Sequence, residues 1–167
     1  MTRRTQKRRR KENKTDYKLR MNLLKSGKPR IVIRKTNKYF IAQAVESHEA
    51  QDKVLAGVSS RDLIKKGWDG KFKGSLKGVP AGYLTGLLMA KKLSDSKDEF
   101  ILDLGMARTI YGNRIYAVVT GLVDGGVNVK VDKKVFPSKE RLDGEHLKPE
   151  VKEMISKVKS KLGVQNG

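Results

Sequence analysis

Apolar and polar residues alternate early in the chain with the two-residue period of β-strands. Three runs have this character and are rich in β-branched or aromatic residues: 29–35 (PRIVIRK), 39–46 (YFIAQAVE) and 53–59 (KVLAGVS). The connection 36–38 (TNK) consists of residues that favour turns. Three successive strands with short polar connections predict an antiparallel meander. In this register Arg30 and Arg34 lie on the same face of the first strand.

Other segments have apolar residues three and four positions apart, which is the spacing of one helix face. A short helix is predicted to run to Leu24, with Thr15 or Asp16 as its cap and Gly27 as its stop. Further helices are predicted at 80–93, from a cap at Asn113 to the Gly125-Gly126 pair, and from Pro149 with Val151, Met154, Ile155, Val158 and Leu162 aligned. Two short apolar runs, 100–104 (FILDL) and 127–131, predict a fourth and a fifth strand.

A meander followed by alternating strands and helices predicts an α/β body with a mixed five-stranded sheet covered by helices. A length of 167 residues suits one such domain with an additional arm or tail. We expect residues 1–28 to form a basic RNA-binding arm with its short helix, 29–135 the α/β body, and 136–167 a C-terminal extension. The last helix is expected to pack on the body as an appendage.

Charge changes this picture because it is both large and concentrated. The chain has 38 Lys and Arg against 18 acids, a formal net charge of +20, and an isoelectric point near 10.2. Residues 1–38 hold 16 of these cations and only two acids, Glu12 and Asp16. Such an excess in one segment predicts a polyanionic partner.

The first fourteen residues, MTRRTQKRRRKENK, have no apolar side chain after Met1, so burial cannot offset the entropy of ordering them. We expect this basic arm to be disordered when free and to become ordered on RNA. Bidentate arginine contacts and counterion release would both favour binding. The arm's candidate RNA-binding residues are Arg3, Arg4, Lys7, Arg8, Arg9, Arg10, Lys11 and Lys14. The alternative is a solvated tail or a nuclear-import-like patch.

Two further basic clusters are candidates for RNA contact. Residues 65–78 (KKGWDGKFKGSLKG) are rich in Gly and Lys and are predicted to be a flexible loop in which Lys71, Lys73 and Lys77 face RNA. Trp68 in this loop is equally suited to stacking on bases and to filling the core. The second cluster is 107–114 (ARTIYGNR), where Arg108, Tyr111, Asn113 and Arg114 can donate to phosphate and ribose. It is expected at the carboxyl edge of the sheet, where α/β proteins commonly bind ligands. The alternative is that these residues form only a helix cap with incidental charges.

The sequence offers little for catalysis. Cysteine is absent, and the two histidines, His48 and His146, are far apart in the chain. Asp103 and Asp124 could suggest a two-metal nuclease, but structural hydrogen bonds explain them better. No apolar run approaches the length of a membrane span, and the N-terminal stretch does not resemble a secretion signal. We therefore expect an intracellular chain with no catalytic residues, no metal and no cofactor.

Several stretches together resemble one family. The run 23–43 (LLKSGKPRIVIRKTNKYFIAQ) is similar to the hallmark of the universal 5S-RNA-binding protein family of the large ribosomal subunit, in its archaeal form. The stretches 80–88 (PAGYLTGLL), 101–126 (ILDLGMARTIYGNRIYAVVTGLVDGG) and 136–150 (FPSKERLDGEHLKPE) agree with it. With the basic arm, these stretches cover nearly the whole chain in order.

The resemblance implies a ribonuclease-H-like three-layer αβα body, used as a binding scaffold without nuclease activity. It also implies a cytoplasmic protein of the large ribosomal subunit that binds 5S rRNA and helps attach it to large-subunit rRNA in the central protuberance, near the other 5S-binding ribosomal protein. No membrane or small-molecule substrate is implied. By position, the RNA contacts would include the arm and Tyr17, Arg20, Lys25, Ser26, Lys28, Arg30, Arg34, Lys35, Asn37 and Lys38, as well as Arg108, Tyr111, Asn113 and Arg114.

Three classes of function could use a basic chain of this kind, and they require different features of the sequence. A ribosomal scaffold requires a basic arm, a compact body with one basic side, and no catalytic centre. A nuclease or RNA-modifying enzyme requires carboxylates, histidines or a cofactor loop that converge in a cleft, which the sequence does not offer. A free nucleic-acid chaperone or assembly factor requires only the charge, so the family resemblance alone favours the scaffold over it.

Overall fold

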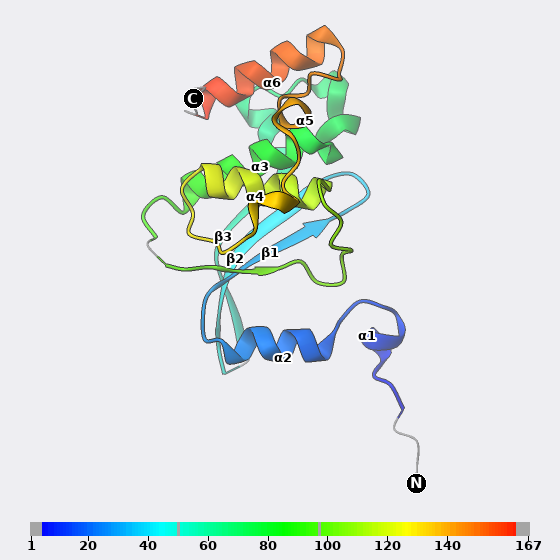
Figure 1. The fold of residues 1–167 in the computed structure, drawn as a ribbon, viewed down its shortest axis with the longest axis vertical. Helices are drawn as coiled ribbons and strands as arrows, with labels where there is room; N and C mark the ends of the chain where they lie inside the picture. Colours follow the sequence, from blue (N-terminus) through cyan, green and yellow to red (C-terminus); the bar gives the residue numbers. More distant parts are fainter. Residues whose placement is uncertain (1–4, 50, 97, 163–167) are drawn as a thin grey trace.

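The sheet has four strands, and their order confirms the predicted meander. The computed structural model describes residues 5–49, 51–96 and 98–162. The strands are β1 (Arg30–Lys35), β2 (Phe40–His48), β3 (Gln51–Ser59) and β4 (Ile101–Asp103), in the spatial order β3-β2-β1-β4 (Figure 1). β1 pairs antiparallel with β2, and β2 with β3, whereas β4 pairs parallel with β1.

The predicted fifth strand is wrong. Residues 127–131 lie beside β4, but they form only an isolated parallel bridge in which Val129 is opposite Phe100. The Phe100 amide donates to the Asn128 carbonyl at 2.9 Å. Because β4 is only three residues long, it offers too short an edge for a neighbouring ladder to extend. The five-stranded sheet expected from the sequence is therefore a four-stranded sheet with one added bridge.

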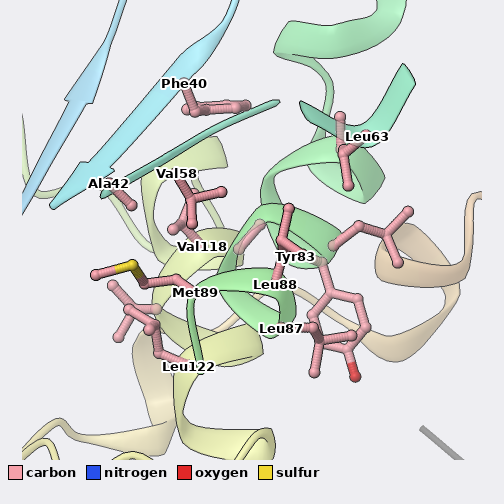
Figure 2. Close-up of a cluster of buried hydrophobic side chains, with 14 of the residues drawn as sticks. Phe40, Ala42, Val58, Leu63, Tyr83, Leu87, Leu88, Met89, Val118 and Leu122 are labelled. Carbon is pink, nitrogen blue, oxygen red and sulfur yellow. The ribbon is translucent and has the colours of Figure 1, made fainter. Parts of the chain in front are cut away.

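Two helices cover one face of the sheet. α3 (Val79–Lys92) and α4 (Arg114–Asp124) lie side by side above it (Figure 1). Alternate strand residues, including Ile31, Ile33 and Ala42, are fully buried beneath them, as the two-residue period requires. Figure 2 shows Ala42 and Val58 from the strands next to Met89 of α3 and Val118 of α4, in the same buried cluster as Phe40.

Glycines allow α3 and α4 to touch backbone to backbone. A Cβ added at Gly86 would collide with the Val118 carbonyl oxygen, and one at Gly121 would collide with the Tyr83 carbonyl oxygen. The two residues therefore face each other where the helices cross. No side chain larger than hydrogen fits at either position without separating the helices.

The segment predicted to be a flexible Gly/Lys loop is instead helical. Residues 65–78 contain the end of one 3₁₀ helix, η1 (Ser60–Lys66), and the whole of a second, η2 (Gly70–Lys77), and Ser59 and Asp62 form a capping box at the start of η1. Trp68 is buried between them, and its Nε1 donates to the Phe72 carbonyl at 3.2 Å. The structure therefore supports the role of Trp68 in filling the core and not the role in stacking on bases.

The C-terminal segment belongs to the same core rather than packing as an appendage. α5 (Lys139–Asp143) and α6 (Pro149–Lys161) follow a single 3₁₀ turn, η3 (Lys133–Val135). The predicted stripe on α6 is confirmed: Val151, Met154, Ile155, Val158 and Leu162 are buried in the one hydrophobic cluster that also contains the sheet. Asp143 on α5 accepts from Lys159 Nζ at 2.9 Å, which joins α5 to α6.

The basic end of the molecule lies on the other side of the sheet from α6 (Figure 1). It contains a single helical turn, α1 (Arg8–Lys11), which the sequence did not predict, and the predicted helix, α2 (Tyr17–Lys25). Asp16 caps α2 by accepting from the Lys18 and Leu19 amides, and Gly27 follows it with a positive φ of 63°. None of residues 5–28 is buried. In the described ranges, no helix is both long and apolar enough to span a bilayer.

Candidate RNA interface

Arg30 is a buried structural residue. Its side chain is 2% exposed, and it binds two carboxylates, with Nη1 3.1 Å from Asp103 Oδ2 and Nη2 2.8 Å from Asp52 Oδ1. Nη2 also donates to Ser47 Oγ at 2.9 Å. A guanidinium that is enclosed and paired in this way offers nothing to a phosphate. This burial argues against the predicted RNA contact of Arg30, which instead ties β1 to β4 and to the β2–β3 hairpin.

Arg34 lies on the same face as Arg30, as predicted, and on the other side of Asp103. Its Nη2 is 2.8 Å from Asp103 Oδ1, and its Nη1 donates to the Asp103 carbonyl at 2.6 Å. Asp103 Oδ1 also accepts from the Gly105 amide at 3.0 Å, so this carboxylate has the structural role expected of it. Nearly half of the Arg34 side chain remains exposed. Asp103 therefore fixes the start of the 104–113 loop and leaves Arg34 partly accessible.

Arg20 extends this network to α2. Its Nη2 donates to Asp52 Oδ2 at 3.1 Å, so Asp52 joins α2 to the hairpin and to Arg30. Burial raises the pKa of the Asp52 carboxyl, but the Ser47 hydrogen bond and the charges of Arg30 and Arg20 outweigh it, and the pKa is lowered overall. Asp52 is thus held ionised between two guanidiniums.

The cations of the arm are exposed and only weakly paired. Glu12 lies 2.7 Å from Lys14 and 3.8 Å from Arg8, and such surface pairs contribute little. Lys7 Nζ lies 4.7 Å from the centre of the Tyr17 ring. The exposed cations on the described part of the arm are Lys7, Arg8, Arg9, Arg10, Lys11 and Lys14. Arg3 and Arg4 lie outside the described residues.

The residues around β1 are mostly at the surface. Lys25, Ser26, Lys28, Lys35, Asn37 and Lys38 are exposed. The Ser26 hydroxyl donates to the Leu23 carbonyl at 2.6 Å and so serves the end of α2. Lys28 and Lys130 both bind Glu99, and their hydrogen bonds, Lys28 first, lower the pKa of the Glu99 carboxyl. Lys35 is exposed at the end of β1 and has no ion pair among the described residues.

The 104–113 loop follows β4 and leads into α4, at the carboxyl edge where the sequence placed it. Arg108 and Arg114 are exposed, and Tyr111 is 74% exposed. Asn113 caps α4 by accepting from the Ile115 amide, and its Nδ2 donates to the Arg108 carbonyl at 3.0 Å. Asn113 is thus positioned mainly for structure, whereas the arginines and Tyr111 are free to contact a ligand.

Beside this loop is a cavity of about 640 Å³, here called the basic hollow. Among the described residues, six cations and no carboxylate line it: Lys14, Arg34, Lys35, Arg108, Arg114 and Arg141. The fold therefore gathers cations from the arm, from β1, from the 104–113 loop and from α5. Lys77 lies next to it, since Arg114 Nη1 donates to the Lys77 carbonyl at 3.5 Å. Lys71 and Lys73 are exposed but do not line the hollow.

Three exposed side chains that line the hollow were not predicted from the sequence: Met106, Ile110 and Arg141. Arg141 comes from α5, a helix too short to show an apolar period. Met106 and Ile110 belong to the 104–113 loop and are 50% and 58% exposed, although both are large and apolar. Their neighbours in sequence had indicated only polar chemistry. Nothing local distinguishes an exposed apolar side chain from one that packs in the core.

A hollow lined by cations on a small α/β body is typical of proteins that bind nucleic acid. In the described residues no three His, Cys, Asp or Glu side chains gather as a metal site would require. A family model described as "Ribosomal large subunit proteins 60S L5, and 50S L18" matches residues 2–99. The chain belongs to this family of large-subunit ribosomal proteins.

Curated relatives carry the similarity beyond residue 99. "Large ribosomal subunit protein uL18" of Caldivirga maquilingensis is 45% identical over 142 residues, which cover 84% of this chain and 67% of that protein. The protein of the same name from Methanoculleus marisnigri is 44% identical over 141 residues, covering 84% of this chain and 78% of its own length. The one from Methanoregula boonei is 40% identical over 141 residues, with coverages of 84% and 79%. The archaeal form of the family, expected from the sequence, is the form that these relatives represent.

Proposed function

We propose that this protein is a structural constituent of the large ribosomal subunit that binds 5S rRNA and helps attach it to large-subunit rRNA in the central protuberance. Its partners there would be the two RNAs and neighbouring ribosomal proteins, including the other 5S-binding protein. It would act in the cytoplasm as a scaffold and not as an enzyme. The observation that carries the proposal is the family match over residues 2–99, which includes the arm and the meander.

The geometry supports one continuous RNA-binding surface. Lys14, from the basic stretch 1–14 of the arm, lines the basic hollow together with cations of β1 and the 104–113 loop. The arm and the body thus present their charge together. The division into an arm (1–28), a body (29–135) and a C-terminal extension (136–167) stays a proposal about which parts bind RNA, since residues of the extension share the core of the body. The strand order, with the 127–131 bridge beside β4, supports the proposal that the body is a ribonuclease-H-like scaffold.

We assign the RNA contacts to the accessible cations and to Tyr111, because phosphate contacts supply affinity and exposed aromatic rings can stack on unpaired bases. We do not assign a contact to Arg30 because its side chain is buried. Asn113 and Arg20 act mainly within the protein, as a cap and as a partner of Asp52. Lys71 and Lys73 form a separate basic surface on η2, which we propose contacts RNA beyond the hollow.

The proposed function is tested by measuring the affinity of the purified protein for 5S rRNA and for an unrelated structured RNA of equal length. Specific sites commonly bind several orders of magnitude more tightly than competing nucleic acid, so we expect a preference of at least about 100-fold at near-cellular salt. Filter binding over a range of salt concentrations measures both affinities. Equal affinity for the two RNAs would contradict the proposal and would indicate a general RNA chaperone.

Removing residues 1–14 should weaken binding to 5S rRNA without unfolding the body. The slope of log affinity against log salt falls by about 0.7 to 0.9 for each phosphate that the protein no longer neutralises, so the truncated chain should respond less steeply to salt. Its free energy of unfolding should stay within about 0.5 kcal/mol of the full-length value, because none of the described arm residues is buried. Salt-dependent binding and urea unfolding measure the two effects.

A matched pair of variants separates charge from length. Changing Arg8, Arg9 and Arg10 together to Lys preserves the charge and should largely preserve the salt slope, whereas changing them to Gln should reduce it. If the Gln variant bound with the wild-type slope, the arm would not contact phosphate.

A further inference from the structure

The basic hollow has an apolar wall as well as a cationic one. Met106 and Ile110 line it with half or more of their surface exposed, and Leu104 and Ala107 lie beside them, partly buried. Exposed apolar side chains gathered in one concave place indicate a binding site. Phosphate binding alone would not require this wall, since phosphates are bound by charge and hydrogen bonds.

The 104–113 loop that forms this wall is held at both ends. At its start, the Gly105 amide donates to Asp103 Oδ1, and Gly105 has a φ of 61°. At its end, the Gly112 amide donates to the Val135 carbonyl at 2.9 Å, and Gly112 has a φ of 64°. The wall is therefore formed before any ligand arrives, which lowers the entropy lost on binding.

The charges beside the wall select the chemical class of the ligand. Lys35, Arg108 and Arg114 border the hollow, and no carboxylate from residues 5–49, 51–96 or 98–162 lines it to offset their charge. The ligand thus combines negative charge with a flat or apolar group. Its size is limited too, because about 640 Å³ is the volume of a small-molecule site and is too small for a stacked duplex.

We propose that the basic hollow binds a single unstacked nucleotide of the rRNA, with its base against Met106 and Ile110 and its phosphates at Lys35, Arg108 and Arg114. This rests on the proposed function and specifies how that surface recognises RNA. A methionine thioether packs well on an aromatic ring, and unpaired bases are the parts of RNA that proteins read most readily. Lys14, also at the hollow, places the arm next to the bound nucleotide.

The test uses the full chain with 5S rRNA and two matched variants, Ile110→Ala and Ile64→Ala. Both isoleucines are exposed, by 58% and 37%, but Ile64 lies on η1, away from the hollow. Loss of the apolar surface that the base would cover weakens binding, so Ile110→Ala should reduce the affinity by about fivefold or more, with an unchanged salt slope. Ile64→Ala should bind like the wild type.

Two further readouts locate the nucleotide. In ¹³C-methyl NMR spectra of the complex, the methyl signals of Met106 and Ile110 should move upfield from the ring current of the base, while that of Ile64 should not. Chemical probing of the RNA should find one base that the wild type protects and that Ile110→Ala leaves reactive.

The outcomes separate the two proposals. Suppose that the wild type binds 5S rRNA selectively, that the Ile110→Ala and Ile64→Ala variants bind it with equal affinity, and that the methyl signals of Met106 and Ile110 do not move. The nucleotide site is then overturned, and the proposed function stands. If the methyl signals respond only when a neighbouring ribosomal protein is added, the hollow is a protein site and the inference is likewise overturned. Absence of any preference for 5S rRNA in the wild type would overturn both.

Discussion

Replacing Gly121 with alanine should destabilise the protein by about 3 kcal/mol, the upper part of the usual range for overpacked cores. The added Cβ would collide with the Tyr83 carbonyl oxygen and lie 3.0 Å from the Leu87 amide nitrogen, both backbone atoms of α3. Backbone atoms cannot rotate aside as a side chain does, so the helices must separate. At about 2 to 4 °C per kcal/mol for a chain of this size, a thermal melt should show a loss of roughly 6 to 12 °C.

Gly74→Ala is the matched control. A Cβ at Gly74 has no neighbour within 4 Å, and Gly74 lies inside η2. This substitution should leave the melting temperature nearly unchanged. If the Gly121→Ala and Gly74→Ala variants had the same melting temperature, α3 and α4 would not cross as closely as described.

Arg30→Ala should lower the free energy of unfolding by about 3 kcal/mol or more, because removing one partner leaves a buried carboxylate incompletely compensated. Asp103 would keep Arg34 but lose the buried guanidinium, and Asp52 would keep only Arg20 and the Ser47 hydroxyl. Urea unfolding measures this loss. The RNA affinity of the fraction that remains folded should change little, because Arg30 is not accessible.

Lys35→Ala should have the opposite pattern. Lys35 is the last residue of the same strand, is exposed, and lines the basic hollow. Its loss should leave the unfolding free energy nearly unchanged, weaken binding to 5S rRNA, and reduce the salt slope by about one phosphate contact. An Arg30→Ala chain that stayed fully stable yet lost RNA binding would show that Arg30 contacts RNA after all.

The fold was predictable where the pattern is local and repeated. β1 to β3, α3, α4 and α6 each have enough residues to show a period, and Asp16 and Asn113 mark the helix starts by their caps. The segment 65–78 was predicted to be a loop because of its glycines and lysines, but most of it is helical. Trp68 lies in the core cluster with residues of α6, and the Asp69 amide lies 3.1 Å from the Met154 sulfur. A contact across 85 residues leaves no local signal.

The candidate site was predictable as a set of cations but not as a surface. Charge and position identified Lys14, Lys35 and Arg108, which the fold brings to one hollow. The same reasoning included Arg30, because a sequence shows that a residue is charged but not which acids will enclose it. Asp52 and Asp103 reach Arg30 from separate strands, 22 and 73 residues away. Pairing across a sheet thus decided which arginine is buried and which stays partly exposed.

The glycine crossing of α3 and α4 also affects how the hollow meets its ligand. Val79 begins α3, Arg114 and Ile115 begin α4, and all three line the hollow. Two helices whose backbones touch cannot slide past each other without giving up that close packing, so these walls keep a constant separation. A hollow of constant width would leave the conformational adjustment to the nucleotide that we propose it binds, which would have to unstack to enter.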